Sequence, residues 1–93
     1  MKISSEKREK ISEQILAFLY SISPQSSFTY HIAKEIARDE EFTKSLLVTL
    51  KKKGLVLEIK KNPEGETYLR RMRWRLSDRA YKIYHESQHK QIF

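Results

Sequence analysis

Residues 46–56 read LLVTLKKKGLV, and this stretch contains the change of periodicity from which the fold is predicted. Up to Lys53 the apolar residues keep helical spacing and share one face: Phe42, Leu46, Leu47 and Leu50. Residues 55–61 then alternate between two sides, as a strand does. Gly54 stands just past the helix, where left-handed backbone is favoured. The stretch therefore predicts a helix that begins at an Asp39 cap and runs through Lys53, followed directly by a strand.

The strand is predicted to be the first half of a β-hairpin of about residues 55–76. Residues 62–65, Asn-Pro-Glu-Gly, place proline where a type I turn needs a fixed φ and glycine where the chain reverses. The return strand, about 66–76, has one face with Tyr68, Arg70, Met72, Trp74 and Leu76, and another with Leu69, Arg71, Arg73 and Arg75. Tyr68 and Trp74 suit stacking on unpaired bases. Their apolar neighbours make core packing the better interpretation.

Three more helices complete the expected set. The first runs from about Ser5 to Ile22, with Ile11, Ile15, Phe18, Leu19 and Ile22 at helical spacing. After an extended Phe28, Thr29 is predicted to cap a short helix whose apolar side carries Ile32, Ala33 and Ile36. Ser77 is predicted to cap the last helix, about 78–90, whose stripe is Ala80, Ile83, Tyr84 and Ser87.

The positive charge is concentrated on the hairpin segment. The whole chain has a formal charge of +7, and residues 51–75 hold nine Lys and Arg against three Glu, a net +6. A local excess of this size indicates a polyanionic partner, most plausibly nucleic acid. The alternative is a solubilising surface with chance clustering, which we disfavour because solubility does not require the charge on one element.

Composition limits the other functions. A chain of 93 residues with 39% hydrophobic residues predicts one domain, residues 1–93, with a marginal core that a partner subunit would stabilise. The sequence has no cysteine, no apolar signal-peptide core and no run of about 20 apolar residues. We expect a soluble, intracellular (cytoplasmic) protein with no membrane association.

The element order of three helices, a hairpin and a helix, carried by particular residues, resembles the winged helix-turn-helix family. More narrowly, it resembles the small MarR- and PadR-like regulators of archaea and their viruses. The residues that carry the resemblance are Ile32 to Ile36 for the first helix of the turn motif, Leu46 to Val56 for the recognition helix and its exit, and Trp74 to Ser77 closing the wing. The resemblance implies an α+β, mostly helical winged-helix fold.

By this resemblance the third helix enters the DNA major groove and the wing lies along the backbone or in the minor groove. The family's exposed recognition positions correspond to Lys44 and Ser45 for bases or nearby phosphates, Val48 for a thymine methyl group and Lys52 for phosphate. Lys60, Lys61, Arg71 and Arg73 would supply backbone contacts from the wing. Arg75 lies nearer to the domain body.

Three carboxylates depart from this pattern. Asp39, Glu40 and Glu41 suit the helix dipole at the start of the recognition helix but oppose a nearby phosphate. Glu41 falls on the predicted binding face. Either it accepts a hydrogen bond from a cytosine amino group, or the helix docks shallowly; we favour shallow docking.

The last helix contains a zinc-protease-like string, His85-Glu86-Ser87-Gln88-His89. A catalytic zinc needs a third protein ligand and a dry cavity, and no His, Asp or Glu follows the string. We interpret it as a solvated or interface helix face, and His31 as a surface or partly packed residue rather than a ligand. We predict no enzyme activity, no cofactor and no metal.

The sequence thus predicts a homodimer, formed through the first and last helices, that regulates transcription by binding a short, roughly palindromic site in double-stranded DNA. Two alternatives stay open. The first is a protein-interaction module, a role that winged helices also serve. The second is a non-specific chromatin-coating protein.

Overall fold

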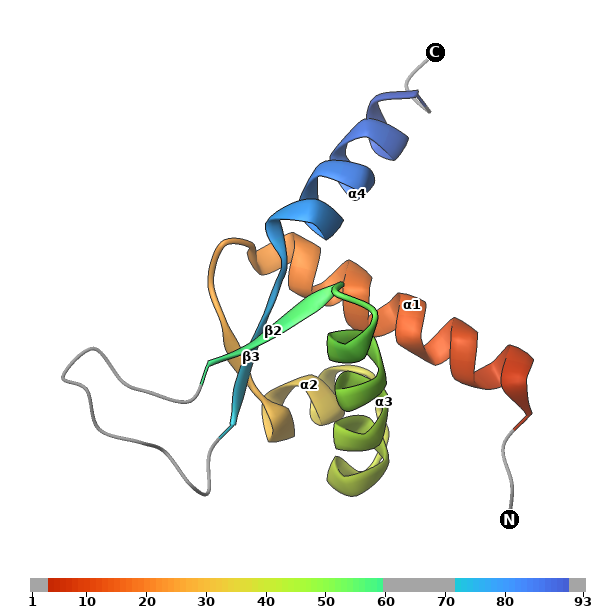
Figure 1. The fold of residues 1–93 in the computed structure, drawn as a ribbon. Coiled ribbons are helices and arrows are strands. Elements are labelled where there is room, and N and C mark those ends of the chain that lie inside the picture. The colour runs from red at the N-terminus through yellow and green to blue at the C-terminus, as the bar shows by residue number, and fades with distance from the viewer. Residues whose placement is uncertain (1–3, 60–71, 91–93) are drawn as a thin grey trace, which may run out of the picture.

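The computed structural model describes residues 4–59 and 72–90, with side chains up to Ser87. These residues form four helices and three short strands (Figure 1). The helices are α1 (Ser5–Ile22), α2 (Thr29–Glu35), α3 (Glu40–Lys52) and α4 (Asp78–Lys90), and the strands are β1 (Ser27–Phe28), β2 (Val56–Ile59) and β3 (Arg73–Leu76). The predicted α+β, mostly helical fold class is confirmed.

Helix α1 has the predicted bounds, and both its amphipathic pattern and its N-cap account for them. The Ser4 hydroxyl accepts a hydrogen bond from the Lys7 amide at 3.3 Å, which satisfies one of the free amides of the first turn. Ile11, Ile15 and Leu19 are buried against the rest of the core. None of the helices in residues 4–59 and 72–90 has both the length and the apolar character needed to cross a membrane.

The predicted cap of α2 is wrong by one residue. Phe28 occupies the N-cap position without a side-chain hydrogen bond, and Thr29 is the first helical residue. The Thr29 hydroxyl instead donates to the Met72 carbonyl at 3.2 Å and accepts from Trp74 Nε1 at 2.8 Å. A buried carbonyl or indole N–H without a hydrogen bond costs more free energy than a helix end that can bond to water. The Thr29 hydroxyl therefore bonds to these buried groups.

The turn between α2 and α3 is closed by a Schellman motif. The Arg38 amide donates to the Ala33 carbonyl at 2.9 Å, and the Ala37 amide donates to the Lys34 carbonyl at 3.2 Å. Ala37 therefore takes a left-handed backbone with φ of 57°. The predicted Asp39 cap of α3 is confirmed, since its carboxylate accepts from the Phe42 amide at 2.7 Å.

Helix α3 ends at Lys52, one residue before the predicted Lys53, which is its C-cap; the predicted left-handed glycine follows. Gly54 has φ of 77°, and its amide donates to the Lys51 carbonyl while the Leu55 amide donates to the Leu50 carbonyl. The chain then enters β2, which pairs antiparallel with β3 in the register Val56 to Leu76 and Ile59 to Arg73.

A three-stranded sheet with the order β1-β3-β2 holds the described part of the hairpin. On β3 the predicted faces are confirmed: Trp74 and Leu76 are buried, and Arg73 and Arg75 are on the other side and half-buried. On β2, Val56 is buried and Leu57 is 40% exposed. The predicted turn at 62–65 and the start of the predicted return strand lie outside the described residues.

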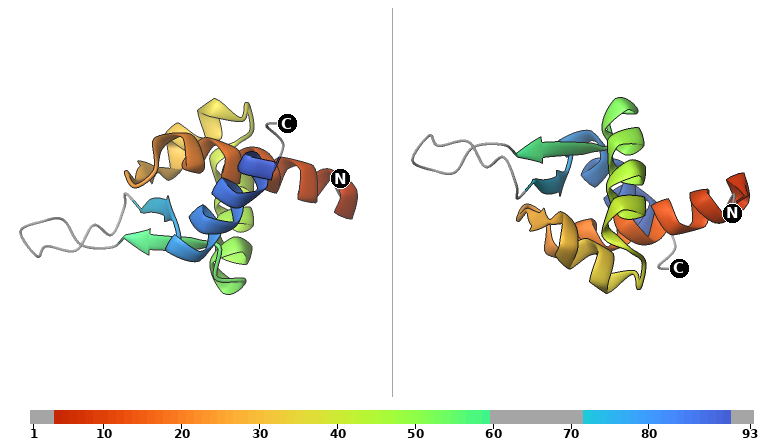
Figure 2. Two further views of the ribbon diagram at one scale, coloured as in Figure 1. Left: turned by 90° about the horizontal axis from the view of Figure 1, so that it is seen from above. Right: turned by 90° about the horizontal axis from the view of Figure 1, so that it is seen from below.

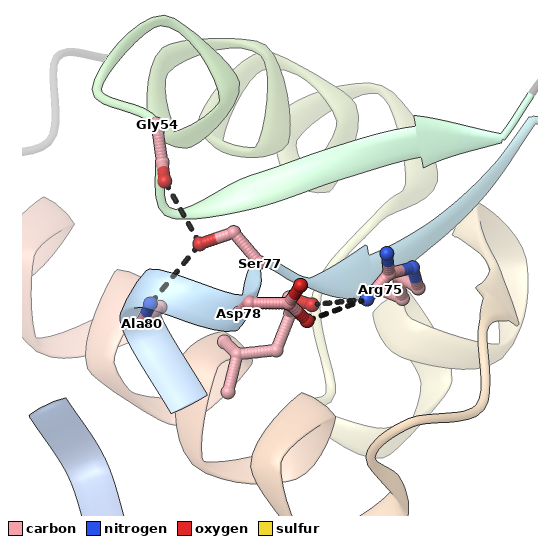
Figure 3. A network of polar contacts seen from close by, with 6 residues as sticks. Gly54, Arg75, Ser77, Asp78 and Ala80 are labelled. Carbon is pink, nitrogen blue, oxygen red and sulfur yellow. Dashed lines mark hydrogen bonds and ion pairs between the residues drawn. The ribbon is translucent and has the colours of Figure 1, made fainter. Parts of the chain in front are cut away.

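Helix α4 begins at a junction between the sheet and the end of α3 (Figure 3). The Ser77 hydroxyl accepts from the Ala80 amide at 3.1 Å, as the cap prediction requires, and also donates to the Gly54 carbonyl at 2.9 Å. From there α4 leads away from the rest of the chain (Figure 1). Of its predicted apolar stripe, Ala80 is buried and Tyr84 half-buried, whereas Ile83 is 51% exposed because no described element covers it.

Candidate nucleic-acid interface

Helix α3 is positioned by its apolar face. Thr43, Leu46, Leu47 and Leu50 are buried, and the helix packs against α1, α2 and β2 (Figure 2). The Thr43 hydroxyl donates to the Asp39 carbonyl at 2.8 Å, so this polar side chain is satisfied within the helix. The opposite side of α3 is left to solvent.

The predicted recognition residues lie together on this outer side. Glu41, Lys44, Ser45 and Val48 line one shallow depression. Lys44 and Ser45 are exposed and Val48 is half-buried, while Lys52 is exposed one turn further along. We call the five residues Glu41, Lys44, Ser45, Val48 and Lys52 the α3 ridge.

Charge is divided along α3. Glu40 and Glu41 occupy its first turn, and Lys51 and Lys52 its last, so both sets complement the helix dipole. Lys51 forms an ion pair within the chain, since its Nζ lies 2.8 Å from Glu58 Oε1. The carboxylate of Glu41 shares a depression with Lys44, so the α3 ridge presents both a hydrogen-bond acceptor and a cation.

The Ser45 hydroxyl has a partner within α3. It donates to the Phe42 carbonyl at 2.7 Å. The oxygen retains acceptor capacity, and rotation about the side chain would turn its proton outward. Ser45 is therefore equipped to accept from a base amino group, or to donate after losing one weak local bond.

The predicted wing residues fall into two groups. Lys60, Lys61 and Arg71 lie outside the described residues. Arg73 is described, and its guanidinium carbon lies 5.9 Å from the centre of the Phe28 ring. Arg75 is held against the start of α4, where its Nη1 donates to the Leu76 carbonyl at 3.1 Å and lies 3.6 Å from Asp78 Oδ1 (Figure 3).

Two exposed residues beside the wing were not selected as binding residues by sequence reasoning. Tyr30 is 45% exposed, and its ring centre lies 4.1 Å from that of His31. The Tyr30 ring also stacks on Phe28, with the centres 5.9 Å apart. The signal in the sequence was the run Phe-Thr-Tyr-His at 28–31, which places aromatic rings at a helix start.

The zinc-like string lies on α4. His85 is exposed, and its Nδ1 lies 3.4 Å from the Tyr20 hydroxyl, while the side chain of His89 lies outside the description. Within the residues whose side chains are described, no group of three or more His, Cys, Asp or Glu side chains is arranged to hold a metal ion. Nearby, burial and then the charge of Glu13 raise the pKa of the Tyr84 phenol above its usual value.

Comparison with solved structures identifies the fold. The S. aureus MepR-DNA complex matches with a TM-score of 0.73 and 20% identity, over 90% of this chain and 66% of MepR. The chain has a winged-helix fold. In the terms of this fold α2 and α3 form the helix-turn-helix, and β2 and β3 are the described parts of the wing.

Two other solved structures match over more of this chain. ZitR from Lactococcus lactis, a zinc-responsive MarR family member, matches with a TM-score of 0.64 and 19% identity, over 98% of this chain and 56% of ZitR. A transcriptional regulator from Clostridium thermocellum matches with a TM-score of 0.63 and 21% identity, over 97% of this chain and 88% of its own. This chain thus spans less than two thirds of MepR and of ZitR. No protein-family model matches it, and no curated protein does.

Proposed function

We propose that this winged helix is a transcriptional regulator that binds double-stranded DNA in a sequence-specific manner as a homodimer, in the manner of a small MarR-like protein. The observation that carries the proposal is the α3 ridge, an exposed set of hydrogen-bonding, apolar and cationic side chains on the recognition helix. The likeness to MepR, which was solved in complex with DNA, supports it.

In this proposal α3 lies in the major groove. Lys44 and Ser45 contact base edges or nearby phosphates, and Val48 contacts a thymine methyl group. Lys52, at the far end of the ridge, contacts a phosphate. Because Glu40 and Glu41 repel phosphates at the start of α3, the helix docks shallowly at that end.

The wing supplies the salt-sensitive part of the affinity. Lys60, Lys61, Arg71 and Arg73 contact the sugar-phosphate backbone, and each phosphate contact releases condensed counterions. A gel-shift titration over a series of salt concentrations tests this role. Arg71→Ala and Arg73→Ala are expected to weaken specific and non-specific duplexes about equally and to reduce the salt dependence. Unchanged binding in both variants would contradict the wing assignment.

The dimer is proposed to form through α1 and α4. Tyr81 and Ile83 on α4 are 41% and 51% exposed, and a second copy would bury them. A two-fold dimer would place its two recognition helices about 34 Å apart, one turn of DNA. Sedimentation is expected to give a dimer at tens of micromolar, and a monomer there would contradict the dimer while leaving DNA binding intact.

The second candidate is a protein-interaction module. The exposed Glu40 and Glu41 favour it, because acidic side chains at the start of α3 suit a basic protein surface better than DNA. A gel shift at low salt with mixed genomic fragments separates the two candidates: DNA binding requires a shift. Equal affinity for every duplex would instead indicate a non-specific chromatin-coating protein.

We also propose that the protein has no enzymatic activity, needs no metal, and acts in the cytoplasm on the nucleoid. The triple change Glu86→Gln, His85→Ala and His89→Ala is expected to leave DNA affinity within a few fold. Stoichiometric zinc that survives dialysis, with peptide cleavage abolished by Glu86→Gln alone, would contradict this.

A further inference from the structure

The start of α2 carries a cluster of three neighbouring rings, which we call the stack, that the α3 ridge and the wing do not account for. Tyr30 is 45% exposed and His31 is also exposed, although their ring centres are only 4.1 Å apart. Phe28 extends the stack, at 5.9 Å from Tyr30 and 6.1 Å from His31. Large exposed aromatic side chains on one surface are typical of contact sites.

The stack lies where the start of α2 meets the described part of the wing. Phe28 pairs with Arg73 in the sheet, so the rings sit at the point where the described part of the wing ends. Figure 1 and the right view of Figure 2 both place the start of α2 beside the start of β3. Since α2 packs on α3, the stack connects the wing to the recognition helix along one side of the protein.

The backbone under the stack is firmly held. The Thr29 amide and hydroxyl both donate to the Met72 carbonyl, and the hydroxyl accepts from the fully buried Trp74. Tyr30 and His31 therefore project from a fixed segment, and a contact made by them costs little ordering entropy.

The chemistry of the stack fits a phosphate better than an apolar partner. A phenol and an imidazole each offer a hydrogen-bond donor to a phosphate oxygen. Arg73 beside Phe28 and the exposed Lys34, one turn after Tyr30, add positive charge, while Glu35 follows one turn after His31.

We propose that Tyr30 and His31 form a second DNA contact, which binds the phosphodiester backbone beside the groove that α3 enters. This inference rests on the proposed function. The Tyr30 hydroxyl donates to one phosphate, and the stacked rings hold that hydroxyl at a fixed distance from the α3 ridge, so the contact sets the register of the protein on its site rather than the base sequence it prefers.

The test compares two single-atom changes in otherwise intact protein. Tyr30→Phe removes only the hydroxyl, and Ser26→Ala removes the hydroxyl of a residue just before β1, outside the α3 ridge, the wing and the proposed dimer helices. Affinity is measured on a duplex selected with the wild-type protein, and thermal melting checks that each variant is folded. Tyr30→Phe is expected to weaken binding about three- to tenfold, and Ser26→Ala less than twofold. His31→Ala is expected to weaken binding several fold.

Phosphate ethylation interference then locates the contact. In the wild type, ethylation of one phosphate outside the bases read by α3 is expected to weaken binding, and in Tyr30→Phe the same ethylation is expected to have little further effect. If the wild type binds a duplex but Tyr30→Phe and His31→Ala bind it equally well, this inference is overturned and the proposed function stands. If the wild type binds no duplex at any salt concentration, both are overturned.

Discussion

Lys51 Nζ lies 2.8 Å from Glu58 Oε1, so an ion pair ties the last turn of α3 to β2, the first strand of the wing. The Glu58 side chain is only 6% exposed, whereas that of Lys51 is 46% exposed. A carboxylate so little exposed depends on its partner far more than an exposed lysine does. The pair therefore fixes the angle at which β2 leaves α3.

Loss of Lys51 is expected to cost more than loss of its neighbour Lys52. Lys51→Met leaves the Glu58 carboxylate without this partner and is expected to lower the free energy of unfolding by about 1–3 kcal/mol. Lys52 is exposed and forms no ion pair with any described residue. Lys52→Met is expected to change stability by less than about 0.5 kcal/mol. Urea denaturation measures both, and equal effects would contradict this role of the pair.

The hydrogen bond between Thr29 and Trp74 predicts that losing the Thr29 hydroxyl lowers stability more than losing the exposed Thr49 hydroxyl. Thr29→Val keeps the shape of the side chain but leaves the buried indole N–H without its acceptor, at an expected cost of about 1–3 kcal/mol. Thr49→Val is the matched control, since the exposed Thr49 hydroxyl bonds only to the Ser45 carbonyl of its own helix. Its effect on the melting temperature is expected to be small; a larger loss in Thr49→Val than in Thr29→Val would rule out the proposed importance of the bond.

Schellman turns end both α2, at Ala37, and α3, at Gly54. Substitutions at these two positions are expected to change stability in opposite directions. Ala37 has a φ of 57°, so Ala37→Gly is expected to relieve backbone strain and stabilise the protein by about 0.5–1 kcal/mol. Gly54 has a φ of 77°, and a Cβ added there would meet Arg79 Nη1 only at 3.8 Å. The cost of Gly54→Ala is therefore purely that of the backbone, about 1 kcal/mol. Urea unfolding of the two variants should shift the midpoint in opposite directions.

Tyr84 predicts a loss of stability in alkali. Burial, and secondarily the charge of Glu13, raise the pKa of its phenol, so the folded state holds the proton more strongly than the unfolded state. The stabilisation is complete below the usual tyrosine pKa of about 10 and is lost as the pH rises through the folded-state pKa. Above about pH 10 the wild type should lose stability more steeply than Tyr84→Phe, with Glu13→Gln between them; identical pH profiles of unfolding free energy would contradict the assignment.

Much of the fold was predictable because its signals are local. Asp39 and Gly54 delimit α3 through their own backbone and side-chain chemistry, and the alternation of Trp74 and Leu76 with arginines defines the buried face of β3. The role of Thr29 was not predictable, since its partner Trp74 is 45 residues away and only the pairing of β1 with β3 brings them together.

The candidate site was predictable to a similar extent. Helical periodicity places the α3 ridge on one face, and the structure brings Glu41, Lys44, Ser45 and Val48 around one depression. Alternation in β2 could not indicate which face is buried, because both faces carry apolar residues: Val56 is buried, and Leu57 is exposed. The contact of Tyr30 with His31 has a local signal in the run 28–31, but the position of these rings beside Arg73 depends on the long-range pairing of β1 with β3.

The central claim, that the α3 ridge reads duplex DNA, is tested most directly by selection from a library of random duplexes. The wild type is expected to enrich a roughly palindromic site with two half-sites about one helical turn apart. Lys44→Ala or Ser45→Ala should change the bases enriched, whereas Arg73→Ala should retain the wild-type site at lower affinity. No enrichment by the wild type, or the same enriched site for all four proteins, would contradict the claim.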